Sequence, residues 1–193
     1  MREKRFGLVN RLLHWAIAFT VLFLLLTILL RMGWMNKDNI GKIVQASLKV
    51  SGQAISLEQA QQIGKDVRRP MWNYHILAGY VLIGLYLIRA GLTAINGIAF
   101  KNPFSGETSG KEKFRSWLYI IFYFLLAVSL FTGLMVVNGP KDLKEGMEWI
   151  HVKSLYYVVV FIIVHILGVV IADAGAEKGV ISRMITGSKS KDF

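Results

Sequence analysis

The chain contains no cysteine and only three prolines among its 193 residues. The absence of cysteine excludes disulfide bonds, covalent attachment of a c-type haem and iron–sulfur clusters held by thiolates. Charge is also scarce: Asp, Glu, Lys and Arg make up 18% of the residues, whereas hydrophobic types make up 54%. A soluble domain of this length would carry charge on about a quarter of its residues. The composition therefore predicts a membrane protein, in which histidine, carboxylate or noncovalent contacts hold any metal or cofactor.

Four long apolar segments account for most of the chain, at about residues 11–32, 71–95, 116–139 and 149–172. Each is long enough, at 1.5 Å per residue, to cross the ~30 Å hydrocarbon core of a bilayer as an α-helix. We do not expect the first to be a signal peptide, because its apolar run is too long and no small-residue cleavage site follows it. Residues 1–193 are expected to form a single all-α membrane domain, a bundle of four transmembrane helices.

The connection at residues 33–70 is long for a loop between helices of a bundle and is expected to contain structure of its own. One short amphipathic helix is predicted by an apolar stripe of Ile40, Ile43, Val44 and Leu48. A second is predicted to start at Ser56-Leu57-Glu58-Gln59, which fits the capping-box pattern. Two interpretations stay open. The helices lie flat on the membrane surface, or they form a lid or docking platform over a cofactor at that surface.

The net charge of the chain is +11. Four spans place both termini on one side of the membrane, and that side carries twelve Lys and Arg residues against ten on the other. Because positively charged loops favour the cytoplasm, this bias predicts cytoplasmic N and C termini. The charge is expected to orient the protein and to bind acidic lipid headgroups. Nucleic acid is not an expected partner, because the basic residues are spread over both sides.

All four histidines lie in or within a few residues of an apolar span: His14, His75, His151 and His165. Ionisable side chains inside a bilayer are costly and usually mark function. His151 and His165 are fourteen residues apart on the fourth span, which predicts nearly the same helix face and a separation of about 21 Å. One metal ion cannot bind both at bond lengths of about 2 Å. The two histidines are therefore expected to serve two different centres.

Helix direction supplies a partner for each of these two histidines. His14 and His165 are expected near the side of the termini, and we call them the termini-side pair. His75 and His151 are expected near the opposite side, and we call them the loop-side pair. Two stacked haems, each with a histidine on either face of its iron, fit this pattern. Two alternatives stay open: a membrane histidine that only hydrogen-bonds between helices, and zinc, which needs clustered ligands in spans that lack carboxylates.

Two arginines are candidate partners for a haem propionate. Arg89 lies fourteen residues after His75, on the same helix face and near the side of the termini. It either marks the helix end by snorkelling or pairs with a propionate of the termini-side haem. Arg11, one turn before His14, is the second candidate. An interfacial belt without assigned chemistry is expected from Trp15, Trp72 and Trp149.

With these features the chain resembles the bacterial four-helix di-haem cytochromes b, the superfamily of cytochrome b-561 and of the b-type subunit of nickel–iron hydrogenases. The resemblance is carried by Arg11-Leu12-Leu13-His14-Trp15, by His75 with Arg89, by His151 with His165, and by the tail at residues 179–187. It implies two b haems held by the two histidine pairs, electron exchange with a quinone, and a place in the bacterial inner (cytoplasmic) membrane with a cytoplasmic N-terminus. The long connection at residues 33–70 departs from the most compact members.

Three functions stay open at this point. The first is transmembrane electron transfer between a quinone/quinol pool and a redox partner, such as a dehydrogenase, a hydrogenase-like enzyme or a c-type cytochrome. The second is a self-contained superoxide:quinone oxidoreductase, because some compact proteins that resemble this chain oxidise superoxide. The third is a haem-free scaffold or transporter, although the span cores lack the proline breaks that transporter helices often have. The sequence decides neither the direction of electron flow nor the quinone-site residues, nor whether the chain is itself an enzyme.

Overall fold

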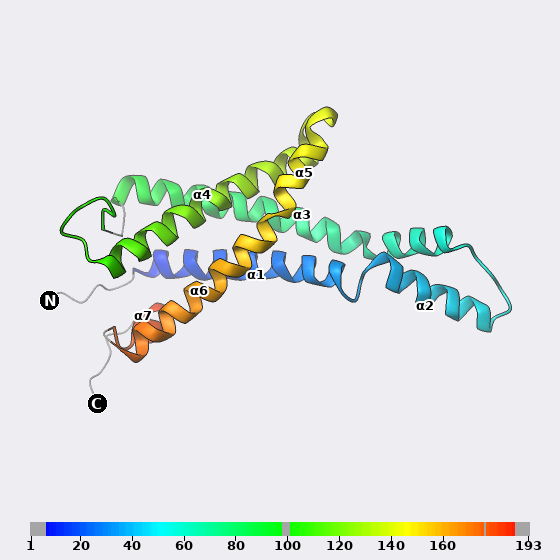
Figure 1. The fold of residues 1–193 in the computed structure, drawn as a ribbon, viewed down its shortest axis with the longest axis horizontal. Coiled ribbons are helices and arrows are strands. Elements are labelled where there is room, and N and C mark those ends of the chain that lie inside the picture. The colour runs from blue at the N-terminus through cyan, green and yellow to red at the C-terminus, as the bar shows by residue number, and fades with distance from the viewer. Residues whose placement is uncertain (1–6, 98–100, 176, 188–193) are drawn as a thin grey trace. The chain divides into compact units, whose positions relative to one another are not determined.

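The computed structural model describes residues 7–97, 101–175 and 177–187. Every regular element in these three segments is a helix (Figure 1). In chain order they are α1 (Leu8–Met32), α2 (Lys37–Val50), α3 (Leu57–Asn96), α4 (Gly110–Asn138), the short 3-10 helix η1 (Lys141–Leu143), α5 (Lys144–Val152), α6 (Ser154–Ala174) and α7 (Val180–Thr186). The expected all-α fold class is confirmed for this part of the chain. The ends at residues 1–6 and 188–193, for which a cytoplasmic location is predicted, lie outside the described residues.

Four helical segments are long and apolar enough to cross a membrane: Leu8–Met32, Leu57–Asn96, Gly110–Asn138 and Lys141–Ala174. They correspond to the four spans that the apolar runs predict, with the third ending one residue earlier than expected. Many of their large apolar side chains are exposed, among them Phe124 on α4 and Ile171 on α6. Water would penalise so much exposed apolar surface, whereas hydrocarbon does not.

Capping boxes begin two of the helices. Before α3, the Gln59 N–H donates to Ser56 Oγ (3.1 Å) and the Ser56 N–H donates to Gln59 Oε1 (3.0 Å). Before α4, Ser109 and Glu112 exchange the same two bonds. Each box satisfies two backbone donors that the first helical turn leaves without partners. The helix start at Leu57 is thus where the sequence predicts one.

The helix that starts at Leu57 differs from the expected short surface helix. It runs without interruption through Pro70 into the second span, so α3 has 40 residues and extends about 60 Å, roughly twice the hydrocarbon thickness. From the sequence, the connection is expected at residues 33–70 and the second span from residue 71, and a proline disfavours the helical conformation of the residue before it. Proline removes only one backbone donor, and the helical turns on both sides of Pro70 form nonetheless. Residues 57–70 are therefore continuous with a membrane-spanning helix and are not an independent helix on the membrane surface.

The chain divides into two compact units, one made of Met1–Ile17 with Ile83–Phe193 and the other of Ala18–Leu82. The single-domain organisation stays a prediction. In the second unit, α2 packs closely against the start of α3. A Cβ added at Gly41 would lie 3.3 Å from the Ala60 backbone, and one added at Gly64 would lie 2.7 Å from the Lys37 carbonyl oxygen. Because both contacts involve backbone, a side chain at position 64 would force the two helices apart and one at position 41 would crowd them. The helix α2 and residues 57–70 thus form a tight helical hairpin.

In the first unit, α4 packs against α5 and α6, and α7 packs against α6. The fourth span was predicted as one helix over residues 149–172, but the structure divides it at Lys153 into α5 and α6. The Lys153 N–H bonds to the Ile150 carbonyl (3.1 Å) and the Tyr156 N–H to the Lys153 carbonyl (3.1 Å). These three-residue steps tighten the turn, as in a 3-10 helix. His151 and His165 therefore lie on two consecutive helices. The prediction that they share one helix face assumed a single continuous helix, and this turn interrupts it.

Candidate functional site

The termini-side histidines lie close together in the first unit. His14 comes from α1 and His165 from α6, and their ring centroids are 6.1 Å apart with an interplanar angle of 50°. His14 lies at the start of the apolar run of α1, after Arg11, and His165 lies in the middle of the apolar α6. In the part of the chain that the structure describes, no group of three or more His, Asp or Glu side chains is placed to hold a metal ion. The structure thus brings together the pair that helix direction predicted.

Aromatic rings surround His165. The Phe161 ring, one turn earlier on α6, is nearly parallel to the imidazole, with 5.5 Å between centroids and 10° between planes. Phe161 stacks in turn on the buried Phe122 of α4, at 3.5 Å and 12°. Tyr119 of α4 meets His165 edge-on at 6.4 Å. This stack restricts the rotation of the imidazole. The sequence-based interpretation missed it, although Phe161 at four residues before His165 is a readable signal.

His151 is held by the backbone of α4. Its Nδ1 lies 3.0 Å from the Ser129 carbonyl oxygen. Since a carbonyl oxygen can only accept, Nδ1 carries the proton and donates it. The ring also lies against Gly133, where an added Cβ would be 2.8 Å from the imidazole Cε1. Glycine at position 133 therefore makes room for the imidazole, and no pattern in the sequence singles out that role.

His75, in the second unit, is fixed by two neighbours. Its Nδ1 lies 2.7 Å from the Thr27 hydroxyl oxygen, and that hydroxyl is 2.6 Å from the Leu24 carbonyl oxygen of its own helix. On the other side, the Trp72 ring stacks on the imidazole at 4.9 Å with 1° between planes. Trp72 was expected only as part of an interfacial belt, and Thr27 was not predicted at all. Because His75 and His151 belong to different units, their pairing stays a prediction.

Arg11 binds the end of α7. Its Nη1 donates to the Ile185 carbonyl (3.1 Å), and the indole of Trp15 donates to the Met184 carbonyl (3.2 Å). Cations and donors stabilise the last carbonyls of a helix. The Nε of Arg11 is buried and has no hydrogen-bond partner among the described residues. α7 thus anchors the turn of α1 that carries His14, and Arg11 retains one donor for a further acceptor.

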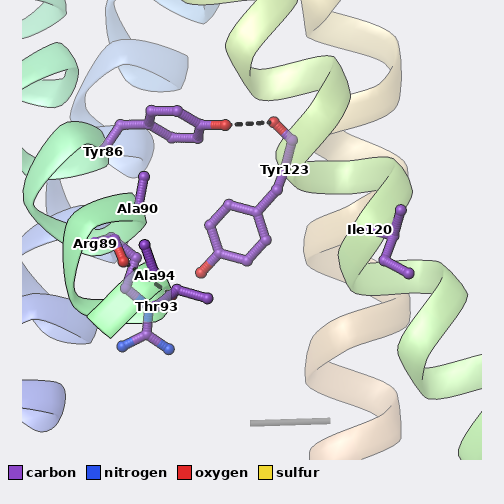
Figure 2. A pocket seen from close by; sticks show the side chains of 7 residues that line it. All are labelled: Tyr86, Arg89, Ala90, Thr93, Ala94, Ile120 and Tyr123. Atoms are coloured by element: carbon purple, nitrogen blue, oxygen red, sulfur yellow. Dashed lines mark hydrogen bonds between the residues drawn. The ribbon is translucent and has the colours of Figure 1, made fainter. Parts of the chain in front are cut away.

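Arg89 lines a cavity between the end of α3 and α4 (Figure 2). The cavity has a volume of about 440 Å³ and is lined by Tyr86, Arg89, Ala90, Thr93, Ala94, Ile120 and Tyr123. The Tyr86 hydroxyl closes one side by donating to the Tyr123 carbonyl (3.2 Å). The Arg89 guanidinium is 3.1 Å from the side-chain oxygen of Asn10 on α1. The phenol ring of Tyr123 extends from α4 toward the Arg89 and Thr93 side chains (Figure 2).

A family model for the prokaryotic cytochrome b561 matches residues 5–187, nearly the whole chain. Neither a curated protein nor a solved structure matches the chain at a significant level. The family match agrees with the helical fold and the four candidate spans, and it confirms the resemblance found in the sequence. The chain therefore belongs to the prokaryotic cytochrome b561 family, and it is a multi-pass bacterial membrane protein of transmembrane electron transfer through b-type haem.

Proposed function

We propose that the protein relays electrons between a quinone/quinol pool and a redox protein partner through two b haems, each held by two histidines. His14 with His165 would hold the termini-side haem, and His75 with His151 the loop-side haem. A haem supplies an iron that takes up and releases one electron at a time. Histidines on both faces leave the iron without an open position, which suits electron transfer rather than oxygen chemistry.

The spacing of the termini-side pair is the observation that carries this proposal. A metal–imidazole bond is about 2 Å long and the ring centre lies about 1 Å behind the bonded nitrogen, so imidazoles on opposite sides of one metal have centroids about 6 Å apart. His14 and His165 have 6.1 Å. The buried Nε of Arg11, one turn before His14, suits a propionate carboxylate as its acceptor. The residues of this site therefore fit a haem.

The hydrogen bonds of the loop-side histidines favour the imidazole tautomer that can bind a haem iron. When Nδ1 donates a hydrogen bond, the lone pair of the neutral imidazole is on Nε2, and metal-ligating histidines usually donate their other N–H in this way. His151 donates to the Ser129 carbonyl. His75 is bonded to Thr27, whose own proton is directed to the Leu24 carbonyl. Both rings are thus prepared to bind metal through Nε2.

The cavity beside Arg89 is the proposed quinone site. Its volume is within the usual range for small-molecule sites, about 300–1,000 Å³, and its lining is mostly apolar with a few polar groups. The Arg89 guanidinium and the Tyr123 hydroxyl are donors for the carbonyl oxygens of a quinone headgroup. Arg89 bonds to Asn10 near the start of α1, so the site would lie toward the side of the termini. We place those termini in the cytoplasm, as the charge bias predicts.

The redox partner would approach from the opposite side, where α2 and residues 57–70 extend past the apolar part of α3. This hairpin has six basic residues at Lys37, Lys42, Lys49, Lys65, Arg68 and Arg69, against three acidic ones at Asp38, Glu58 and Asp66. Opposite charge on a partner would speed association. A dehydrogenase, a hydrogenase-like enzyme or a c-type cytochrome with an acidic face is the partner class that we propose.

A reduced-minus-oxidised spectrum, with haem content measured on the same purified protein, tests the proposal. We expect two low-spin b haems per chain, which a quinol reduces or a quinone reoxidises. One haem per chain would contradict the two-pair assignment, and haems that exchange no electrons with quinol or quinone would contradict the quinone assignment. A superoxide-consumption assay on the same sample decides whether superoxide takes the place of the protein partner.

A further inference from the structure

The four histidines divide into two chemical groups. In both loop-side histidines Nδ1 lies at hydrogen-bond distance from an oxygen, 2.7 Å for His75 and 3.0 Å for His151. The ring nitrogens of the termini-side histidines have no hydrogen-bond partner among residues 7–97, 101–175 and 177–187. His165 is instead held by the stacked ring of Phe161, and His14 packs edge-on against Trp15. A hydrogen bond donated by one ring nitrogen raises the electron density on the other, which is the nitrogen that would bind a metal. The two pairs differ in this respect.

Thr27 has only one way to interact with His75. Its hydroxyl proton points to the Leu24 carbonyl, 2.6 Å away, so its oxygen must accept the proton of His75 Nδ1. Thr27 is 2% exposed. A hydrogen bond in such a buried, apolar environment is stronger than the same bond in water. At His151 the acceptor is a backbone carbonyl, which carries a large dipole. Both acceptors pull the Nδ1 proton away from the ring and make Nε2 a stronger donor to metal.

We infer that Thr27 and the Ser129 carbonyl make the loop-side haem the lower-potential haem of the two, and that Thr27 is a positioning residue for His75. A stronger nitrogen donor stabilises ferric over ferrous iron, and hydrogen bonds to the ligands are among the factors that set haem potentials. The inference rests on the proposed pair of haems. Two arginine charges at the termini side, Arg11 and Arg89, work in the same direction because positive charge favours the reduced state. The positive charge of Arg31, whose guanidinium lies over the Trp72 ring at 4.9 Å from its centroid, acts in the opposite direction.

With this order of potentials, the step from the loop-side haem to the termini-side haem is downhill. Electrons released one at a time by a reduced partner on the loop side would run downhill to the side of the termini. Two of them, with two protons from that side, convert one quinone to quinol at the cavity beside Arg89, while two one-electron donors are oxidised. The protein would thus act as a quinone reductase when its partner is reducing.

The experiment is a potentiometric titration of the purified, haem-loaded protein, followed by absorption, for the wild type, T27V, T27S and T186V. Valine keeps the shape of threonine and removes the oxygen that accepts from His75. Serine restores that oxygen. Thr186 on α7 is the matched control, because its hydroxyl also donates to a carbonyl of its own helix, 3.0 Å away at Ser182.

We expect two components in the wild type, and a rise in the potential of the lower one alone in T27V. T27S and T186V should resemble the wild type. If T27V loses one haem, the haem that remains must be the higher-potential one. The inference is overturned by a shift of the higher component, by the same potentials in all four proteins, or by a T27V protein that keeps only the lower-potential haem. In each of these cases the two haems of the wild type still support the proposed function. One haem or none in the wild type overturns the proposed function instead.

Discussion

His151 and His165 come from the same span and both contact α4, yet α4 holds them in different ways. At His151, α4 offers the backbone oxygen of Ser129 and the missing side chain of Gly133. At His165 it offers the rings of Tyr119 and, through Phe161, Phe122. The depth of a ligand follows from its place along a helix. Its tautomer and the plane of its ring follow from the residues that the neighbouring helix presents at that depth.

The largest effect is expected on haem content, when histidine variants of the termini-side and loop-side pairs are combined. H14A, H165A and H14A/H165A should each retain about one haem per chain, because the three proteins lack the same site. H14A/H151A should retain none, because it lacks a ligand at both sites. Haem content on folded, monodisperse protein provides the measurement. Equal haem content in the two double variants would contradict the assignment of the pairs.

G133A should damage the loop-side end alone. The new Cβ would lie 2.8 Å from His151 Cε1 and 3.2 Å from Nδ1, so the ring must move away from the Ser129 carbonyl. Overpacking of this kind costs about 1–3 kcal/mol. The expected result is partial loss of the lower-potential haem and a lower thermal midpoint, measured on the same preparation. G146A on α5 is the control, since an added Cβ there meets nothing within 4 Å; a loss in both variants would remove the special role of Gly133.

F161L should affect the termini-side end more mildly. Leucine fills most of the space but no longer offers a flat ring to His165, and such a change costs about 1–2 kcal/mol. We expect both haems to stay bound, with an altered electron paramagnetic resonance signal for one of them because the imidazole plane is less restricted. F131L is the matched control, since Phe131 on α4 is 57% exposed. An unchanged signal in F161L would mean that the stack does not orient His165.

The smallest effect is expected at the cavity. Y123F removes one donor to the proposed quinone headgroup, worth about 1 kcal/mol or roughly a fivefold rise in KM. Turnover at saturating quinone, haem content and both potentials should stay as in the wild type. Y156F, at an exposed tyrosine on α6, should leave KM unchanged. If both variants change KM equally, or neither does, the quinone site lies elsewhere.

Much of the fold could be predicted from the sequence because a bilayer imposes a simple length rule. The apolar runs predicted four spans, and Ser56 with Gln59 predicted the helix start at Leu57. The rule does not say where a helix ends in water, so α3 was divided at Pro70 although it continues. It also gave no sign of the turn at Lys153. Patterns read from one segment at a time do not include the contacts of α2 with Gly64 or of α5 with α4, which lie close to these two features.

The sequence by itself determined that four helical segments are long and apolar enough to cross a membrane and which four side chains are candidates for binding metal. It also predicted the depth of each histidine, because chain length and helix rise are enough for such a prediction. Only the tertiary structure decided that His14 and His165 come within 6.1 Å of each other and which atoms hold His75 and His151. Thr27, Gly133 and Phe161 are ordinary residues of apolar helices. Their roles arise only when another helix, or the next turn of the same one, brings a histidine against them.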